Sequence, residues 1–207
     1  LAKFEELPFT TDSAEYDALR SGQVDYGYLP VQDLSQKQYF SSHGFQINDW
    51  LDYGFNDFFL NFTNPTVGPI FKQLYIRQAI QTLINQPQIS QDIYHGAAYP
   101  TYGPIPTRPA NPYTAKIGTD NPYPFSIANA KKLLSSHGWT VHPEGIDTCA
   151  KPGTAANQCG AGVSAGAQLN FTEMVATGSQ PFTAEVEDMQ SAWSEAGIHV
   201  TLKQEPV

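Results

Sequence analysis

Hydrophobic and polar residues follow two different periods along this chain, and these periods predict helices interleaved with strands. The spacing of a buried helix face occurs in residues 13–19, 74–84, 88–94, 126–137 and 181–196. Alternation or a short apolar run, typical of a strand, occurs in residues 3–9, 24–28, 57–63, 168–175 and 198–203. Helices interleaved with strands favour a layered α/β or mixed α+β fold.

Local signals mark where several of these elements begin and end. Asp12 or Ser13 can cap the first helix with a side-chain oxygen, and Gly22 is placed to end it. Ser126 can cap the helix that follows it, and Pro181 suits the first turn of the last helix. We therefore expect these helices to form close to the bounds given above.

Residues 57–63 carry the alternation with the clearest consequence. Phe58, Leu60 and Phe62 fall on one face of the predicted strand, whereas Phe59 and Asn61 fall on the other. One face is expected to pack against the core, and the opposite face is mixed in character.

Prolines exclude any long regular element between residues 96 and 124, because each one fixes φ and removes a main-chain donor. They occur at positions 100, 104, 106, 109, 112, 122 and 124. Apolar side chains in the same stretch predict a stiff loop anchored to the core: Tyr99, Tyr102, Ile105, Tyr113 and Phe125.

Composition and charge narrow the class of protein. The 207 residues are 41% hydrophobic and 13% aromatic, which is enough for a packed core. The formal net charge is -9 and the basic residues are scattered, so a nucleic-acid partner is not expected. No apolar run approaches the roughly eighteen residues of a membrane-spanning helix.

Cys149 and Cys159 lie in a stretch rich in Gly, Pro and Ala that has no helix or strand period. We expect them to form a disulfide, which would place the protein outside the cytosol. Two free thiols are the alternative. A zinc site that uses the nearby His137 and His142 is a further one, but the gap between the cysteines is longer than in zinc modules. No metal or cofactor is therefore expected.

The chain carries few of the usual catalytic signatures. A His-Glu-x-x-His pair, a phosphate-binding loop and a Gly-x-Gly-x-x-Gly fingerprint are missing from the sequence. Residues 162–166 match the letters Gly-x-Ser-x-Gly, but they follow the Cys-containing stretch that has no helix or strand period, so the strand-turn-helix context of a nucleophile elbow is not expected. The acidic run Glu185, Glu187 and Asp188 lies on the outward face of the last predicted helix, so we expect a solvated surface there. Arg77 is expected to be a structural ion pair or hydrogen-bond centre.

The middle of the chain contains several segments in an order found in a known family. These are LYIRQAIQTLI from residue 74, QISQDIYHG from residue 88, PTYGPIP from residue 100 and YPFSIANAKKLLSSHGW from residue 123. The order resembles the extracytoplasmic solute-binding proteins of bacterial ABC importers, in particular the oligopeptide and dipeptide family, family 5. The resemblance implies a fold like type II periplasmic binding proteins, with most of the chain like domain III of the dipeptide-binding protein.

The resemblance also implies a division of the chain. Residues 1–47 would be a strand-helix-strand remnant of lobe I, and residues 48–207 would be most of lobe II, with a Cys-containing loop at residues 145–167. Both ends fall beside a predicted strand, so we expect the chain to be part of a longer protein. The acidic residue that grips peptides in the family would lie beyond this chain, which would hold half a cleft.

In the family, the strand after the crossover and the loop before the late helix face the ligand. The resemblance thereby assigns the ligand-binding role to Asn56, Phe59, Asn61, Tyr102, Thr177, Gly178, Ser179 and Gln180. Thr177 to Gln180 precede Pro181, so they should lie at a helix N-terminus, where free N–H groups favour an anion such as a peptide carboxylate. They could equally serve only to cap that helix.

These points predict a non-enzymatic receptor lobe that binds a peptide-like or other small-molecule solute and delivers it to a membrane permease. We expect a monomer in the periplasm or on the cell surface, with a lipoprotein anchor in the full-length protein. A fragment of a secreted hydrolase or sugar-active enzyme is the alternative from another class. A sensor domain that reuses the receptor fold is a third possibility, and the cargo could also be a sugar or a metal chelate.

Overall fold

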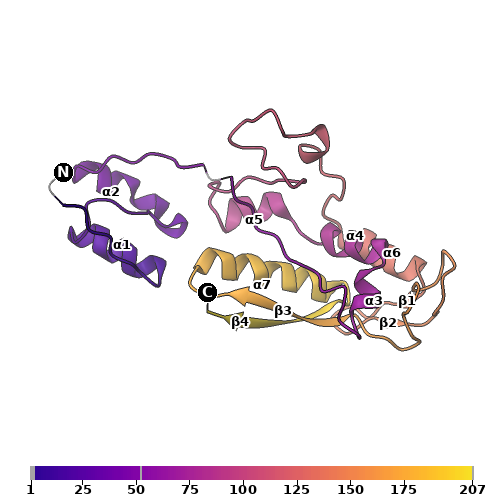
Figure 1. The fold of residues 1–207 in the computed structure, drawn as a ribbon. Helices are drawn as coiled ribbons and strands as arrows, with labels where there is room; N and C mark the ends of the chain where they lie inside the picture. Colours follow the sequence, from indigo (N-terminus) through magenta and orange to yellow (C-terminus); the bar gives the residue numbers. More distant parts are fainter. Residues whose placement is uncertain (1–2, 52, 207) are drawn as a thin grey trace.

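The computed structural model describes residues 3–51 and 53–206. Figure 1 shows a small N-terminal unit joined by an extended segment to a larger body. The N-terminal unit contains α1 (Asp12–Ser21), the 3-10 helix η1 (Val31–Gln36) and α2 (Lys37–Ser42). Its buried side chains are Ala18, Leu19, Pro30, Val31 and Phe40. The ends of the predicted ranges 1–47 and 48–207 include positions outside the described residues, and the boundary between the two ranges stays a prediction.

Two expectations for this unit need correction. Thr11, rather than Asp12 or Ser13, caps α1, because its side chain accepts a hydrogen bond from the main-chain N–H of Ala14. Gly22 ends the helix as predicted, with a φ of 72° that glycine adopts without strain. The predicted strands at residues 3–9 and 24–28 do not form, because no neighbouring strand takes up their main-chain hydrogen bonds.

The body begins with four helices, three of which match the predicted apolar periods closely. The short α3 (Gly68–Phe71) was not predicted, whereas α4 (Leu74–Thr82), α5 (Gln86–Asp92) and α6 (Ile127–Ser136) were, and Ser126 caps α6. Arg77 donates to the carbonyl oxygens of Phe71 and Lys72 at the end of α3, which confirms it as a hydrogen-bond centre.

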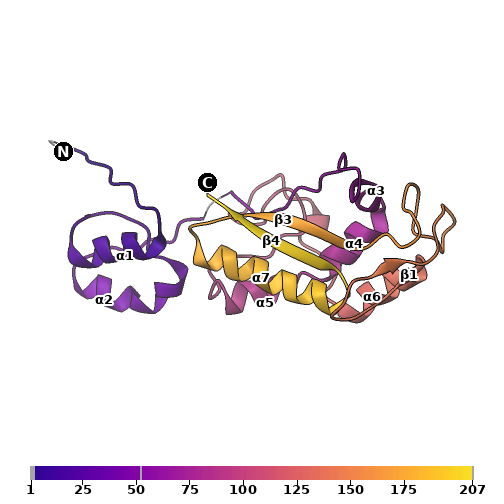
Figure 2. The same ribbon diagram turned by 90° about the horizontal axis from the view of Figure 1, so that it is seen from below.

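The C-terminal part of the body is a strand-helix-strand unit. β3 (Asn170–Ala176) and β4 (His199–Glu205) pair in parallel, from Asn170 opposite His199 to Ala176 opposite Glu205. α7 (Gln180–Glu195) connects them and covers one face of the pair (Figure 2). Its predicted apolar face is buried: Val186, Met189, Trp193 and Ala196. The body thus has the mixed α/β character that the sequence predicts.

The predicted strand at residues 57–63 remains extended at its start but pairs with no strand of the described chain. The predicted orientation of its side chains is confirmed for residues 58–60. Phe58 and Leu60 pack against the core, and the Phe58 ring meets that of Trp193 edge to face at 5.8 Å between centroids. Phe59 is 92% exposed. Phe62 is exposed as well, because the chain turns at Asn61 to enter α3.

The loop between α5 and α6 contains only η2 (Lys116–Gly118), as its prolines require. The expected apolar anchoring is wrong for most of its members, since Tyr99, Ile105, Tyr113 and Phe125 are exposed. Polar contacts hold the loop instead. For example, the Thr101 N–H donates a hydrogen bond to Gln86 Oε1. The side-chain amide of Asn111 donates to the carbonyl oxygens of Pro106 and Pro109.

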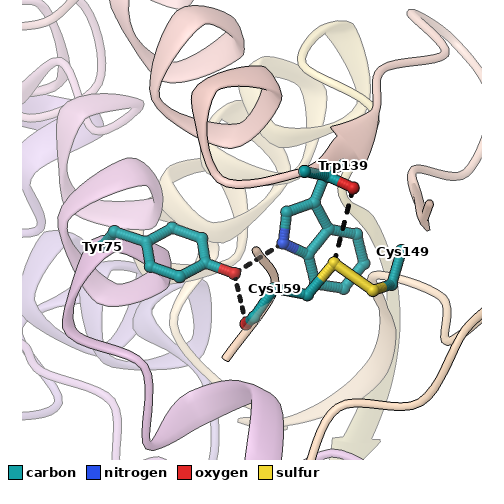
Figure 3. The surroundings of a disulfide bond; sticks show 5 residues. Tyr75, Trp139, Cys149 and Cys159 are labelled. Atoms are coloured by element: carbon teal, nitrogen blue, oxygen red, sulfur yellow. Dashed lines mark hydrogen bonds between the residues drawn. A yellow bond between two sulfur atoms is a disulfide. The ribbon is translucent and has the colours of Figure 1, made fainter. Parts of the chain in front are cut away.

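Cys149 and Cys159 form the predicted disulfide, so neither sulfur can act as a zinc ligand. Figure 3 shows how the bridged loop is attached to the core. The Tyr75 hydroxyl donates to the Cys159 carbonyl oxygen at 2.7 Å and accepts from the Trp139 indole N–H at 2.6 Å. β1 (Trp139–Thr140) pairs with β2 (Thr148–Cys149) beside it, and neither of these short strands was expected.

Asp147 is a fully buried carboxylate that joins separate turns. Its Oδ1 accepts from the His142 N–H at 2.7 Å, and its main-chain N–H donates to the Gly197 carbonyl oxygen at 2.8 Å. A Cβ at Gly197, where φ is 87°, would collide with the Asp147 side chain, so this close approach requires glycine.

The disulfide should account for a measurable part of the stability. Replacing Cys149 and Cys159 together by Ala should lower the free energy of unfolding by about 2 to 3 kcal/mol, because the unfolded chain loses a covalent loop. Denaturant titration of both proteins measures the difference. Thiol titration of the unfolded, unreduced wild type should find no free thiol, and two free thiols would contradict the pairing.

Residues 59 and 60 offer a direct test of the two faces. Leu60→Ala should cost about 2 kcal/mol or more of unfolding free energy because it leaves a cavity against the core. Phe59→Ala should change it by less than about 0.5 kcal/mol, since the ring is in solvent. Urea denaturation of both variants measures the contrast, and the opposite ranking would show that the faces are assigned the wrong way round.

Asp147 predicts a specific dependence of stability on pH. Burial raises the pKa of its carboxyl from the ordinary 3.8 to about 6. The hydrogen bond from the His142 N–H acts in the opposite direction, but its effect on this pKa is smaller. The folded state therefore binds the proton more tightly, and the stability that this group contributes falls as pH rises from 3.8 to about 6. Relative to Asp147→Asn, the free energy of unfolding of the wild type should fall by up to about 3 kcal/mol as the pH rises across that range. Denaturant titrations of both proteins at pH 4 and pH 7 measure this, and an unchanged difference would refute it.

Candidate functional site

The predicted ligand-facing residues fall in three places on the body. Thr177 to Gln180 and Asn56 lie at the N-terminal end of α7, Phe59 and Asn61 lie farther along the extended segment, and Tyr102 lies in the proline-rich loop. The first place faces the N-terminal unit, because a Cβ on Gly178 would stand 3.4 Å from the Thr10 carbonyl oxygen. The structure thus gathers part of the predicted set and separates the rest.

The turn before α7 leaves the helix N-terminus accessible. Thr177 and Gly178 are exposed, and Gly178 has a φ of 107° that only glycine adopts readily. Ser179 occupies the N-cap position, but its side chain makes no capping hydrogen bond. Ser179 thus holds the cap position without a side-chain hydrogen bond, and both the ligand-binding role and the role of a helix cap alone stay predictions. N–H groups of this first turn are available to an anionic or carbonyl group.

Asn56 is engaged within the protein rather than open on all sides. Its amide nitrogen donates to Glu185 Oε2 at 2.6 Å and to the Tyr94 hydroxyl at 3.2 Å. The Tyr94 hydroxyl in turn donates to the same Glu185 oxygen at 2.6 Å. The pKa of Tyr94 is raised by burial and further by the Glu185 carboxylate, so the phenol keeps its proton and acts as a donor.

Glu185 and Tyr94 are the residues that the sequence analysis missed. Glu185 is half-buried, which corrects the expectation that the whole acidic run is solvated. One signal was available in the sequence. Glu185 lies three residues after Phe182 and four before the buried Met189, so it borders the inward stripe of the helix. Asp188 also has a raised pKa, through burial and the neighbouring Asp92.

Phe59 and Asn61 differ from each other in their surroundings. The Phe59 ring is exposed and offers an apolar surface to whatever covers it. The Asn61 Oδ1 accepts hydrogen bonds from the Thr63 N–H, the Thr63 hydroxyl and the Asn64 N–H. This side chain therefore holds the turn that leads into α3, and only its amide nitrogen stays without a partner among the described residues.

Tyr102 is half-buried, and its main-chain N–H donates to the Gly118 carbonyl oxygen at 3.3 Å. Near it, a shallow depression of about 470 Å³ lies between Tyr53 and the proline-rich loop. Its lining is Tyr53, Pro104, Ile105, Pro106, Ala110, Asn111, Pro112 and Tyr113. This concave feature is mostly apolar, so it suits an apolar group better than a charged one.

Two serine–histidine contacts could suggest a nucleophile and base, but both are local. Ser42 approaches His43 and Ser136 approaches His137 at 3.2 Å, each pair being sequence neighbours at a helix C-terminus. The Nδ1 of each histidine also lies 2.8 Å from a main-chain carbonyl oxygen of its own helix. These contacts close the ends of α2 and α6.

The described residues provide neither a cluster of metal ligands nor a membrane-spanning helix. Within residues 3–51 and 53–206, no three His, Cys, Asp or Glu side chains are placed to hold a metal ion. No helix in the same part of the chain is long and apolar enough to cross a membrane.

Comparison with curated proteins finds peptide-binding relatives. Putative ABC transporter peptide-binding proteins of Brucella ovis and Brucella abortus are 30% identical to this chain over 137 residues. The match covers 63% of this chain and 23% of each relative. The aligned part is thus about a quarter of the length of these relatives.

Solved structures show the same fold at low identity. The oligopeptide-binding protein AppA of Bacillus subtilis, in complex with a nonapeptide, matches with a TM-score of 0.60 and 19% identity. NikZ of Campylobacter jejuni, in complex with nickel and L-histidine, matches with a TM-score of 0.59 and 18% identity. Each match covers 96% of this chain and 35% of the other. A mannohexaose-bound protein of Thermotoga maritima matches with a TM-score of 0.57 and 17% identity, over 97% of this chain and 35% of the other.

The family comparison covers the whole sequence. The family described as bacterial extracellular solute-binding proteins, family 5 middle, matches residues 1–207. Members of this family are transport binding proteins rather than enzymes, which overturns the hydrolase alternative. The resemblance seen in the middle of the sequence is confirmed, and the chain belongs to the family 5 extracellular solute-binding proteins of bacteria.

Proposed function

We propose that this chain is part of an extracytoplasmic receptor that binds a peptide or peptide-like solute and presents it to the membrane permease of an ABC importer. Family membership and the peptide-binding relatives support the solute class. Among the solved neighbours, the bound molecules include a nonapeptide, nickel with histidine and mannohexaose, so the fold alone does not choose among cargoes.

The observation that carries the peptide proposal is the face of the body next to the N-terminal unit. The uncapped N-terminus of α7 at Ser179 offers N–H donors for a carboxylate or a main-chain carbonyl. Farther along the extended segment, the exposed Phe59 offers an apolar aromatic surface. The main-chain donors suit the polar backbone of a peptide, and the separate aromatic surface suits an apolar side chain.

The proposal includes the division into lobes. Residues 1–47 belong to lobe I and residues 48–207 to lobe II, so that the ligand lies between the N-terminal unit and the body. The receptor acts as a monomer, and a lipid anchor holds the full-length protein at the membrane. The approach of Gly178 to Thr10 supports the idea that the α7 N-terminus faces the space between the lobes. A sensor that reuses this fold would share the same site.

Identification of the cargo is the first test. The full-length protein that contains this chain should be purified under native conditions and examined by native mass spectrometry. We expect peptides of mixed mass to co-purify. A single oligosaccharide or a metal chelate in their place would overturn the peptide assignment while leaving the receptor class intact.

Substitutions on the exposed face should then weaken binding selectively. In the full-length protein, Phe59→Ala and Asn61→Ala should each reduce the affinity for the co-purifying peptides by about 1 to 3 kcal/mol, as for the loss of a buried contact in a complex. Isothermal titration calorimetry measures the loss.

Glu187→Ala is the matched control, because this exposed side chain lies on the outer face of α7. Its affinity should equal that of the wild type. Wild-type affinity for both Phe59→Ala and Asn61→Ala would show that the cargo does not contact this face.

A further inference from the structure

The extended segment between the N-terminal unit and the body has very few polar attachments. Within this segment, residues 46–51 and 53–60 form no main-chain hydrogen bond with any other described part of the chain. Asp49 contacts Lys37, which belongs to the N-terminal unit. The side chain of Asn56 therefore makes the only hydrogen bonds of this segment to the body within the described residues.

Those hydrogen bonds converge on one carboxylate oxygen. Glu185 Oε2 accepts from Asn56 and from Tyr94, both at 2.6 Å, which is short for such bonds and typical of an ionised acceptor. Asn56, Tyr94 and Glu185 come from the segment, from the residues after α5 and from the second turn of α7, respectively. We call this group the Glu185 clasp.

The Glu185 clasp lies close to the N-terminal unit. Gly178, at the start of the same helix as Glu185, approaches Thr10. Any change in the direction in which the segment leaves Asn56 would therefore move the N-terminal unit against this end of α7.

Glu185 has no cationic partner that could hold it in another way. The ion pairs among the described residues join other side chains, and none of them includes Glu185. Its two short hydrogen bonds are thus its main restraints. Loss of either donor leaves a half-buried carboxylate less satisfied, so the three side chains are expected to act as a unit.

We propose that Glu185 and Tyr94 are positioning residues that hold Asn56 in place, so that the Glu185 clasp forms the pivot about which the N-terminal unit turns relative to the body. In this arrangement the amide nitrogen of Asn56 serves the pivot, and Glu185 and Tyr94 influence ligand binding without touching the ligand. The effect on ligand binding rests on the proposed function, whereas the pivot itself does not.

A distance measurement in the full-length protein tests the pivot without any ligand. Gln38→Cys on α2 and Ser135→Cys on α6 replace exposed residues, and the two native cysteines of this chain are bonded and do not take a label. Any other cysteine of the full-length protein is first replaced by serine, so that spin labels attach to the two introduced positions alone. Double electron–electron resonance then gives the distribution of distances between the label on the N-terminal unit and the label on the body. Glu185→Ala and Tyr94→Phe should each broaden this distribution, and Glu187→Ala, on the same helix, should leave it unchanged.

Coupling between the variants distinguishes a clasp from separate contacts. The double variant Asn56→Ala with Glu185→Ala should broaden the distribution no more than Glu185→Ala alone. Additive broadening, or a wild-type distribution in Tyr94→Phe, would overturn the proposal. Thermal unfolding is measured in parallel, because a merely structural role would lower the melting temperature without changing the distances. Tyr94→Phe keeps the aromatic ring and removes only the hydroxyl, so this variant provides the test if Glu185→Ala does not fold.

Ligand affinity gives an independent readout, with an equimolar mixture of nonapeptides as the probe. Glu185→Ala and Tyr94→Phe should weaken binding about 3- to 10-fold, through the loss of one or two hydrogen bonds that position the lobes. If Asn56→Ala weakens binding while these two variants do not, Asn56 acts by touching the ligand and the positioning role is wrong. If the wild type binds no peptide but the distances respond as expected, the pivot stands and the proposed function fails.

Discussion

The packing of the body depends on the buried indole of Trp193. This side chain is fully buried near the end of α7, and its N–H donates to the Ile80 carbonyl oxygen in α4 at 3.2 Å. Its ring meets Phe58 of the extended segment at 5.8 Å and Phe171 of β3 at 6.5 Å between centroids. One aromatic group thus joins the segment, a helix, a strand and α7 into a common core. An indole can do this because it combines a large apolar area with one donor that requires a partner.

Polar groups organise the opposite end of the body. Tyr75 connects α4 to the disulfide-bridged loop through Cys159 and to β1 through Trp139, and its ring stacks on His137 at 3.9 Å between centroids. Asp147 links the turn after β1 to the turn between α7 and β4. These side chains supplement the short β1–β2 pairing in a region with little other regular structure. The loop is therefore ordered by specific hydrogen bonds on a small apolar base.

The candidate site is assembled at the end of α7 that lies away from this polar region. A helix N-terminus without a side-chain cap and a carboxylate in its second turn lie close together. The first can receive a ligand group, whereas the second holds the segment from the N-terminal unit. The proposed ligand site and the proposed pivot thus share one helix, which is rigid because Val186, Met189 and Trp193 are buried beneath it.

The sequence by itself determined α1, α4, α5, α6 and α7, the pairing of the cysteines, the strand-helix-strand unit at the C-terminal end and the family, whereas the short α2 and α3 were not predicted. These features depend on local period, caps and the order of motifs, all of which are read within a few residues. It also placed Phe58 and Leu60 inward and Phe59 outward, because alternation in an extended chain needs no partner to be seen. Only the tertiary structure decided whether residues 3–9, 24–28 and 57–63 pair as strands, since a strand needs a neighbour from elsewhere in the chain. It alone showed that Glu185, Tyr94 and Asn56 meet, because hydrogen bonds between residues up to 129 positions apart leave no local pattern.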